Sequence, residues 1–235
     1  MKHLVNYQIE RTGADNMRKA TQGISFGDIH SYDDLLLILS KKDIPPAVPK
    51  TTYIDIPGAD DDLDLTEAHG EVKYKSRECS FTFTMHPYDR TDFEEKKTEI
   101  SNLLNGREFK ITLDTDPDYY YQGRCTVKDH LQNINLKQFV ISAKVKAYKF
   151  KQDVTAITFA LSETAKTVNL SNGRKSVCPM IECTNDNTVV VFGDAAFNLG
   201  AGIHKILDIQ FKEGNNTLTV SGKGNITFRY QEGDL

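Results

Sequence analysis

The densest group of side chains that could hold a metal ion is an acidic cluster in the first third of the chain: Asp60, Asp61, Asp62 and Asp64. A loop of this kind could bind Ca²⁺, which takes about six to eight oxygen ligands. The EF-hand spacing also requires a glycine and a terminal bidentate glutamate after the first acidic positions, and that pattern is absent. The cluster therefore favours an acidic turn over a calcium site.

Histidines and nucleophile motifs give no stronger chemical signal. The six histidines are scattered singly, and none lies two or four residues from another: His3, His30, His69, His86, His130 and His204. Zinc sites need clustered ligands, so we expect no metal. Serine-hydrolase, phosphate-loop and dinucleotide motifs do not occur. The 33 acidic residues always offer carboxylate pairs for glycoside hydrolysis, but none stands out. We therefore expect neither an enzyme nor a cofactor.

The most unusual local feature is a run of tyrosines with a basic residue close behind: Tyr119, Tyr120, Tyr121 and Arg124. Aromatic and basic side chains together can stack nucleobases, but three aspartates just upstream, at 114, 116 and 118, would repel phosphate. In a strand the tyrosines alternate between two faces, which favours packing in a sheet. Tyrosine and arginine are also enriched in protein interfaces.

These residues lie in a region that alternates between apolar and polar side chains, as strands of a half-exposed antiparallel sheet do. The alternation predicts strands at residues 71–75, 79–85, 108–113 and 139–147. One helix at about 92–105 interrupts them, with Thr91 or Asp92 as its cap and Gly106 as its terminator. An apolar stripe on that helix would pack on the sheet: Phe93, Ile100, Leu103 and Leu104.

After about residue 150 no helix pattern remains, and short strands recur between glycine and asparagine turns. The pattern predicts strands around 157–161, 189–192, 207–211, 218–220 and 226–230. Strands of this length and spacing are typical of a β-sandwich or jelly roll. We therefore expect a mainly β chain with an N-terminal β-rich domain to residue 150 and a C-terminal sandwich at 151–235.

The segment from residue 41 to 65 is the least regular part of the first domain. Its prolines, at 45, 46 and 49, exclude a central strand, and a turn-rich acidic stretch surrounds a short strand at 51–56. A loop of this length is either a contact arm or a solvated connection. The residues leave these two alternatives open.

Composition sets limits on the function. The 235 residues are 39% hydrophobic and 26% charged, with a net charge of −4, which argues against a disordered or a coiled-coil chain. Without a basic run or a long apolar stretch, we expect no nucleic-acid or membrane partner. The four cysteines include no close Cys-x-x-Cys pair, so we expect reduced, structural thiols, as in a protein made in a reducing cytoplasm.

Taken in chain order, several motifs together resemble the distal tail proteins of long-tailed, non-contractile phages and prophages of Gram-positive bacteria. The motifs lie at residues 23–26, 53–60, 63–66, Tyr74 with Arg77, 103–106, 116–124, 214–220 and 228–233. The match covers residues 23–235. Ala147 departs from the family, which often has proline there, and residues 1–22 form an N-terminal extension that does not align.

The resemblance implies a fold and a role. It implies an N-terminal ring-forming domain at 23–150, of antiparallel sheets or a split barrel, followed by a galectin-like sandwich. Six copies would form a ring in the virion, joining the tail-tube protein to the tail-tip or receptor-binding proteins of the baseplate. A closed ring needs two different patches on each copy. Candidate interface residues are Pro57, Asp60, Leu63, Tyr119, Tyr120, Tyr121 and Arg124.

The alternative is a cell-wall carbohydrate-binding protein, because sandwiches of this kind also occur in lectins. Sugar sites commonly use an aromatic platform, for which tryptophan is the best surface, and the chain has no tryptophan. The aromatic residues of the second domain mostly fall at alternating positions expected of core: Phe192, Phe197, Phe211, Phe228 and Tyr230. The assembly role is therefore the leading hypothesis.

Overall fold

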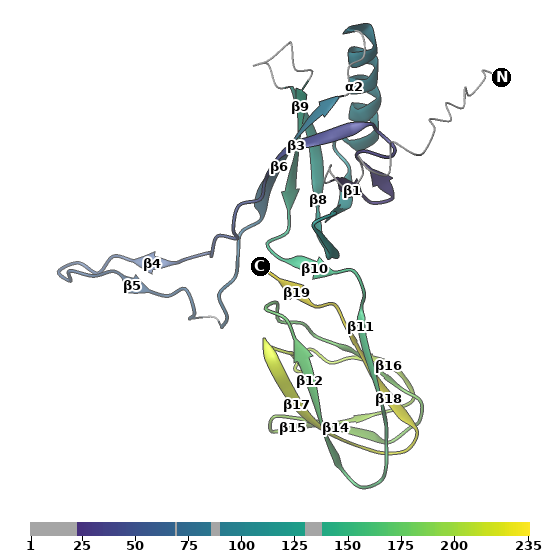
Figure 1. Ribbon diagram of the computed structural model, residues 1–235. Coiled ribbons are helices and arrows are strands. Elements are labelled where there is room, and N and C mark those ends of the chain that lie inside the picture. Colours follow the sequence, from purple (N-terminus) through teal and green to yellow (C-terminus); the bar gives the residue numbers. More distant parts are fainter. Residues whose placement is uncertain (1–22, 69, 86–89, 130–137) are drawn as a thin grey trace. The chain divides into compact units, whose positions relative to one another are not determined.

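The structure is a computed structural model that describes residues 23–68, 70–85, 90–129 and 138–235 (Figure 1). Contacts divide the chain into two compact units built from interleaved segments. Unit 1 comprises the described residues of 23–45, 78–117 and 122–145, and unit 2 those of 46–77, 118–121 and 146–235. The domain ranges 23–150 and 151–235 stay predictions, and the extension 1–22 lies outside the described residues.

Unit 1 is organised by one sheet in the strand order β2-β1-β7-β8-β9-β6-β3. The strands are β1 (Ile24–Phe26), β2 (Ile29–His30), β3 (Leu37–Asp43), β6 (Arg77–Met85), β7 (Glu108–Leu113), β8 (Asp116–Asp129) and β9 (Gln138–Val145). The alternation read from the sequence is confirmed in β6, where Cys79, Phe81, Phe83 and Met85 are buried. The Phe26 ring packs 6.4 Å from those of Phe81 and Phe83, so one face of the sheet forms the core.

The predicted helix is confirmed as α2 (Arg90–Leu104). Ile100 and Leu104 of its apolar stripe are fully buried, while Leu103 and Phe93 are half-buried. Gly106 ends the helix with a φ of 75°, a left-handed conformation that glycine adopts without steric cost. Because the helix already includes Arg90, Thr91 and Asp92 lie inside it and the predicted cap is wrong; their side chains lie outside the described residues.

Unit 2 contains a β-sandwich of two four-stranded antiparallel sheets, ordered β11-β18-β13-β16 and β12-β17-β14-β15 (Figure 1). The strands are β11 (Thr155–Ala160), β12 (Lys166–Asn172), β13 (Met180–Cys183), β14 (Thr188–Phe192), β15 (Ala195–Leu199), β16 (Gly202–Lys205), β17 (Gly214–Ser221) and β18 (Asn225–Tyr230). Their inward side chains form one core around Phe211 and Phe228, whose rings lie 6.2 Å apart. The predicted mainly β fold class is therefore confirmed.

Two predicted strands are wrong. Residues 207–211 form a turn and an isolated bridge between Phe211 and Val177, because β16 ends at Lys205. Ile209 and Phe211 still reach the core on either side of the exposed Gln210, which is the alternation of a strand without its hydrogen-bond ladder. Leu207, predicted on the same face, is 73% exposed and departs from that pattern. Residues 71–75 likewise form no strand, and only Tyr74 makes a bridge, to Pro49.

The end of the chain returns to the start of the sandwich. Strand β10 (Lys149–Lys151) pairs with β19 (Gly233–Asp234) and with Tyr119 and Tyr120 of β8. The Lys151 ammonium lies 2.8 Å from the buried Glu232 carboxylate, and this hydrogen bond raises the pKa of Lys151. These contacts fix the tyrosine run within unit 2.

Candidate functional site

The irregular, proline-containing segment forms an arm, which we define as the described part of residues 46–77. The sequence placed this segment in the first domain, but its contacts place it in unit 2. Its two limbs pair through Lys50 N–H to the Lys73 carbonyl at 2.7 Å and Lys75 N–H to the Val48 carbonyl at 2.8 Å. Farther out, β4 (Tyr53–Ile54) pairs with β5 (Leu63–Asp64), a shorter strand than the predicted 51–56. A turn with Gly58 at a φ of 88° closes the hairpin. The arm is thus an ordered two-stranded element.

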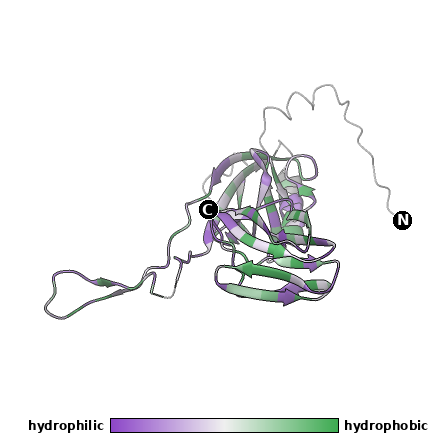
Figure 2. Ribbon diagram, turned by 90° about the horizontal axis from the view of Figure 1, so that it is seen from below, coloured by the Kyte–Doolittle hydropathy of each residue, from purple (hydrophilic) through white to green (hydrophobic). Residues whose placement is uncertain are grey.

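The outer part of the arm exposes large apolar side chains. Tyr53 is 57% exposed, Ile54 47%, Ile56 43% and Leu63 47%. Hydrophobic residues accordingly alternate with hydrophilic ones along this hairpin in Figure 2. An isolated two-stranded hairpin is at best marginally stable in water, so such an element gains from covering these side chains.

The arm tip is also strongly acidic. Residues 51–68 carry six carboxylates and no lysine, arginine or histidine: Asp55, Asp60, Asp61, Asp62, Asp64 and Glu67. Hydrogen bonds from the Thr66 hydroxyl and backbone N–H lower the pKa of Asp64, and the Thr66 hydroxyl also accepts the Thr52 N–H at 3.1 Å. In the part of the chain that the structure describes, no three His, Cys, Asp or Glu side chains gather as metal ligands. The arm is therefore an apolar surface surrounded by negative charge.

The predicted interface residues fall in three places. Pro57, Asp60 and Leu63 are exposed on the arm. Residues 119–121 belong to unit 2, and Arg124 belongs to unit 1, where its guanidinium donates to the Gly106 carbonyl at the end of α2. The interface role of all seven residues stays a prediction.

The tyrosine run makes contacts within unit 2. The Tyr119 hydroxyl donates to Asp234 at 3.0 Å, and the Lys149 ammonium lies 4.2 Å from its ring centroid. Burial, followed by the Asp234 carboxylate, raises the pKa of Tyr119. Tyr120 is buried and stacks on Phe150 at 5.7 Å. The Arg77 guanidinium lies 5.1 Å from the Tyr121 centroid. This arrangement agrees with the sheet-packing interpretation.

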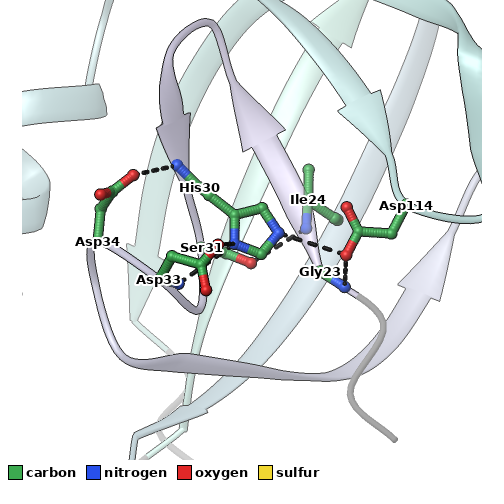
Figure 3. Close-up of polar contacts among 7 residues, drawn as sticks. All are labelled: Gly23, Ile24, His30, Ser31, Asp33, Asp34 and Asp114. Carbon is green, nitrogen blue, oxygen red and sulfur yellow. Dashed lines mark hydrogen bonds and ion pairs between the residues drawn. The ribbon is translucent and has the colours of Figure 1, made fainter. Parts of the chain in front are cut away.

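A histidine between two carboxylates forms a polar cluster in unit 1 (Figure 3). His30 Nε2 lies 3.3 Å from Asp114 Oδ2, and its Nδ1 lies 3.2 Å from Asp33 Oδ2. The Asp114 carboxylate also accepts the Gly23 N–H at 2.8 Å, so the cluster attaches the start of β1 to the end of β7. The sequence shows Asp33 three residues after His30, but it gives no signal for the distant Asp114.

This cluster lacks the arrangement of a nucleophilic site. The Ser31 hydroxyl is fully buried and accepts the Ile24 N–H at 3.0 Å. Nucleophilic catalysis would need that hydroxyl hydrogen-bonded to the imidazole. The cluster is therefore suited to holding strand β1 in place.

A cleft of about 260 Å³ opens in unit 2 between the arm and the sandwich. Its lining residues come from four separate segments of the chain: Glu67, Glu71, Val72, Tyr74, Tyr148, Arg174, Ser176, Lys212 and Glu213. The sequence patterns pointed to none of them as a candidate site residue. Because they are spread over almost 150 positions, no local spacing could have revealed the cleft.

The described helix is too short and too polar to cross a membrane. The four cysteines form no disulfide among the described residues, and Cys79, Cys125 and Cys183 are buried while Cys178 is half-buried. Burial raises the pKa of the Cys125 thiol to about 12, which makes it a poor nucleophile.

Comparison with known proteins gives a likeness in structure. The sequence matches no protein-family model and no curated protein. The fold is similar to the crystal structure of the SPP1 Dit (gp 19.1) protein, described as a paradigm of the hub adsorption apparatus in phages that infect Gram-positive bacteria. The TM-score is 0.66 at 15% sequence identity, and the alignment covers 92% of this chain and 100% of that chain. The chain therefore shares the fold of SPP1 Dit over almost all of its length.

Proposed function

We propose that this protein is a structural component of a phage tail, a distal tail hub that assembles with copies of itself. The observation that carries the proposal is the fold similarity to SPP1 Dit, which extends over 92% of this chain and the whole of the other. A shared single domain would be weak support, because common folds host many functions. A similarity that covers almost all of this chain, and therefore both of its units, supports a role that needs the whole molecule.

In this proposal the hub is a ring of six copies. The ring joins the tail-tube protein to the tail-tip or receptor-binding proteins. Its place is the virion, at the tail tip, and it acts by assembly with no bond made or broken. A closed ring requires that one patch on each copy meets a different patch on the next. The arm offers one such patch, because its exposed Tyr53, Ile54 and Ile56 lie among carboxylates.

The negative charge of the arm indicates what the second patch, which would receive the arm, should be made of. A surface that receives the arm should combine apolar and basic side chains, since opposite charges fix the register of a contact and suppress wrong ones. On β8 and β9 of unit 1, Arg124 lies directly opposite Lys144, and both are exposed. Like charges opposite each other in a sheet repel. Within the same copy, Lys128 and then Lys144 lower the pKa of Glu78, so this carboxylate compensates part of the positive charge. We assign this pair to the receiving patch on a neighbouring copy.

Light scattering after size exclusion, on the full chain alone and mixed with tail-tube and tail-tip proteins, tests the proposal. A mass of several protomers, or a monomer that joins a complex with either partner, supports the hub function. A monomer at every concentration that binds neither partner contradicts it.

A further inference from the structure

The cleft in unit 2 has walls fixed by the fold. Tyr148 directly precedes β10, Arg174 and Ser176 follow β12, and Lys212 and Glu213 precede β17. The returning limb of the arm adds Glu67 and the segment from Glu71 to Tyr74.

Two buried asparagines hold the sandwich side of the cleft. The Asn172 amide donates to the carbonyls of Lys175 at 2.9 Å and Phe211 at 3.1 Å. Asn216 accepts the Lys212 N–H at 2.8 Å and donates to the Lys212 carbonyl at 2.9 Å. The two side chains are 6% and 7% exposed. The backbone beneath the cleft is therefore rigid before any ligand arrives, which reduces the entropy cost of binding.

An aromatic pair forms the apolar part of the lining. The rings of Tyr74 and Tyr148 lie 5.8 Å apart and meet edge to face at 78°. Both tyrosines are half-buried, and Val72 lies beside them. Burial raises the pKa of Tyr148, so its hydroxyl keeps its proton and can donate a hydrogen bond. An aromatic ring with a polar tip suits a ligand that has both C–H faces and hydroxyl groups.

Hydrogen bonds among the lining residues set the directions of the polar groups. The Arg174 guanidinium donates to the Tyr74 hydroxyl at 3.3 Å and pairs with Glu213. The Ser176 hydroxyl donates to Glu71. Each of these groups keeps further donors or acceptors, because a guanidinium carries five N–H bonds and a carboxylate two oxygens. The network is thus preorganised and still able to bond a ligand.

Three other polar groups on the lining make no side-chain hydrogen bond or ion pair among the described residues. They are the Tyr148 hydroxyl, the Glu67 carboxylate and the Lys212 ammonium. These groups supply donors and an acceptor that the fold itself does not use.

The size and charge of the cleft identify its ligand class. At about 260 Å³ it is smaller than the roughly 300–1,000 Å³ pockets that take drug-sized ligands, so it fits a single ring. Three carboxylates disfavour an anion, and Arg174 with Lys212 disfavours a cation. A neutral ring with several hydroxyl groups satisfies alternating donors and acceptors. We propose that the cleft binds one sugar residue of a carbohydrate, stacked on the tyrosines and hydrogen-bonded to the charged side chains.

This sugar site does not depend on the tail-hub function, and it can be tested on the isolated full chain. The probes are the methyl glycosides of glucose, galactose and N-acetylglucosamine, titrated into ¹⁵N-labelled protein and followed by amide chemical shifts. Sodium sulfate and choline chloride serve as an anionic and a cationic probe. We expect saturable shifts with at least one glycoside, confined to amides around residues 67–74, 148, 174–176 and 212–213.

Variants that remove the three polar groups without a side-chain hydrogen bond test whether the chemical shift changes come from binding in the cleft. Glu67→Ala, Lys212→Ala and Tyr148→Phe remove no bond of the described fold, and each should weaken glycoside binding roughly three- to tenfold, as loss of one hydrogen bond does. Glu163→Ala and Tyr32→Phe do not line the cleft and should leave binding unchanged. No glycoside shift at the highest soluble concentration, shifts unaffected by all three cleft variants, or binding of sulfate or choline alone would each overturn the proposal.

Discussion

At the scale of single residues, close approach of two backbones explains one position in the tyrosine-containing motif. A Cβ atom on Gly123 would lie 2.4 Å from the Lys144 carbonyl oxygen and 2.6 Å from the Val145 Cα. Both atoms belong to the backbone of β9, which pairs with β8 at this point, so neither can move without disturbing the sheet. Glycine inside a strand often marks such a contact.

Gly123→Ala should therefore destabilise the protein by about 1–3 kcal/mol, the cost typical of overpacking. Urea unfolding followed by circular dichroism measures the effect. Gly200→Ala is the matched control, since the nearest atom to its Cβ would be a side-chain oxygen of Asp186 at 3.2 Å. Equal stability of the two variants would show that the backbone contact at Gly123 is not tight.

The Cys125 thiol should make the free energy of unfolding depend on pH. Burial raises its pKa from 9.0 to about 12. The unfolded thiol loses its proton near pH 9 while the folded thiol keeps it, so the free energy of unfolding is unaffected by Cys125 below pH 9 and falls as the pH rises toward 12. Urea unfolding at pH 8 and at about pH 11 should show a smaller loss of stability for Cys125→Ala than for the native chain. An identical loss would mean that this thiol does not titrate differently in the two states.

At the scale of elements, the arm separates folding from assembly. Tyr53 and Ile56 are 57% and 43% exposed, so replacing both with serine should change the free energy of unfolding by no more than about 0.5 kcal/mol for each. In whichever sample the native chain forms an oligomer, alone or with tail-tube protein, the same double variant should lose that oligomer in light scattering, because it removes the apolar surface that a neighbour covers. Val154→Ser, at a site 53% exposed outside the arm, is the control. An oligomer that survives the double substitution would exclude the arm as the contact.

Elements with a local signal could be predicted from the sequence. Strand β6 and helix α2 carry their pattern within consecutive residues, and both were found. Residues 207–211 show the limit of this signal: alternating burial continues into a turn because Ile209 and Phe211 still face the core. Hydrophobic alternation reports burial, and only the partner strand decides whether a strand forms.

The candidate sites could not be predicted from the sequence, because the fold brings together residues that lie far apart along the chain. Tyr74, Tyr148 and Arg174 meet in one cleft because the arm and the turn after β12 converge, and nothing in their spacing indicates it. His30 and Asp114 meet because β1 pairs with β7. The arm is the exception, since its prolines and acidic turn marked residues 41–65 as a contact arm or a solvated connection. The structure shows an ordered hairpin with an apolar surface there.

For the whole molecule, we propose a role in assembly in which copies of this chain close into a ring. Negative-stain electron microscopy of the purified full chain, alone and with tail-tube protein, should show that ring. We expect class averages of closed rings with rotational symmetry and a central opening in at least one of the two samples. Separate single particles in both samples, with no ring at any protein concentration, would contradict it.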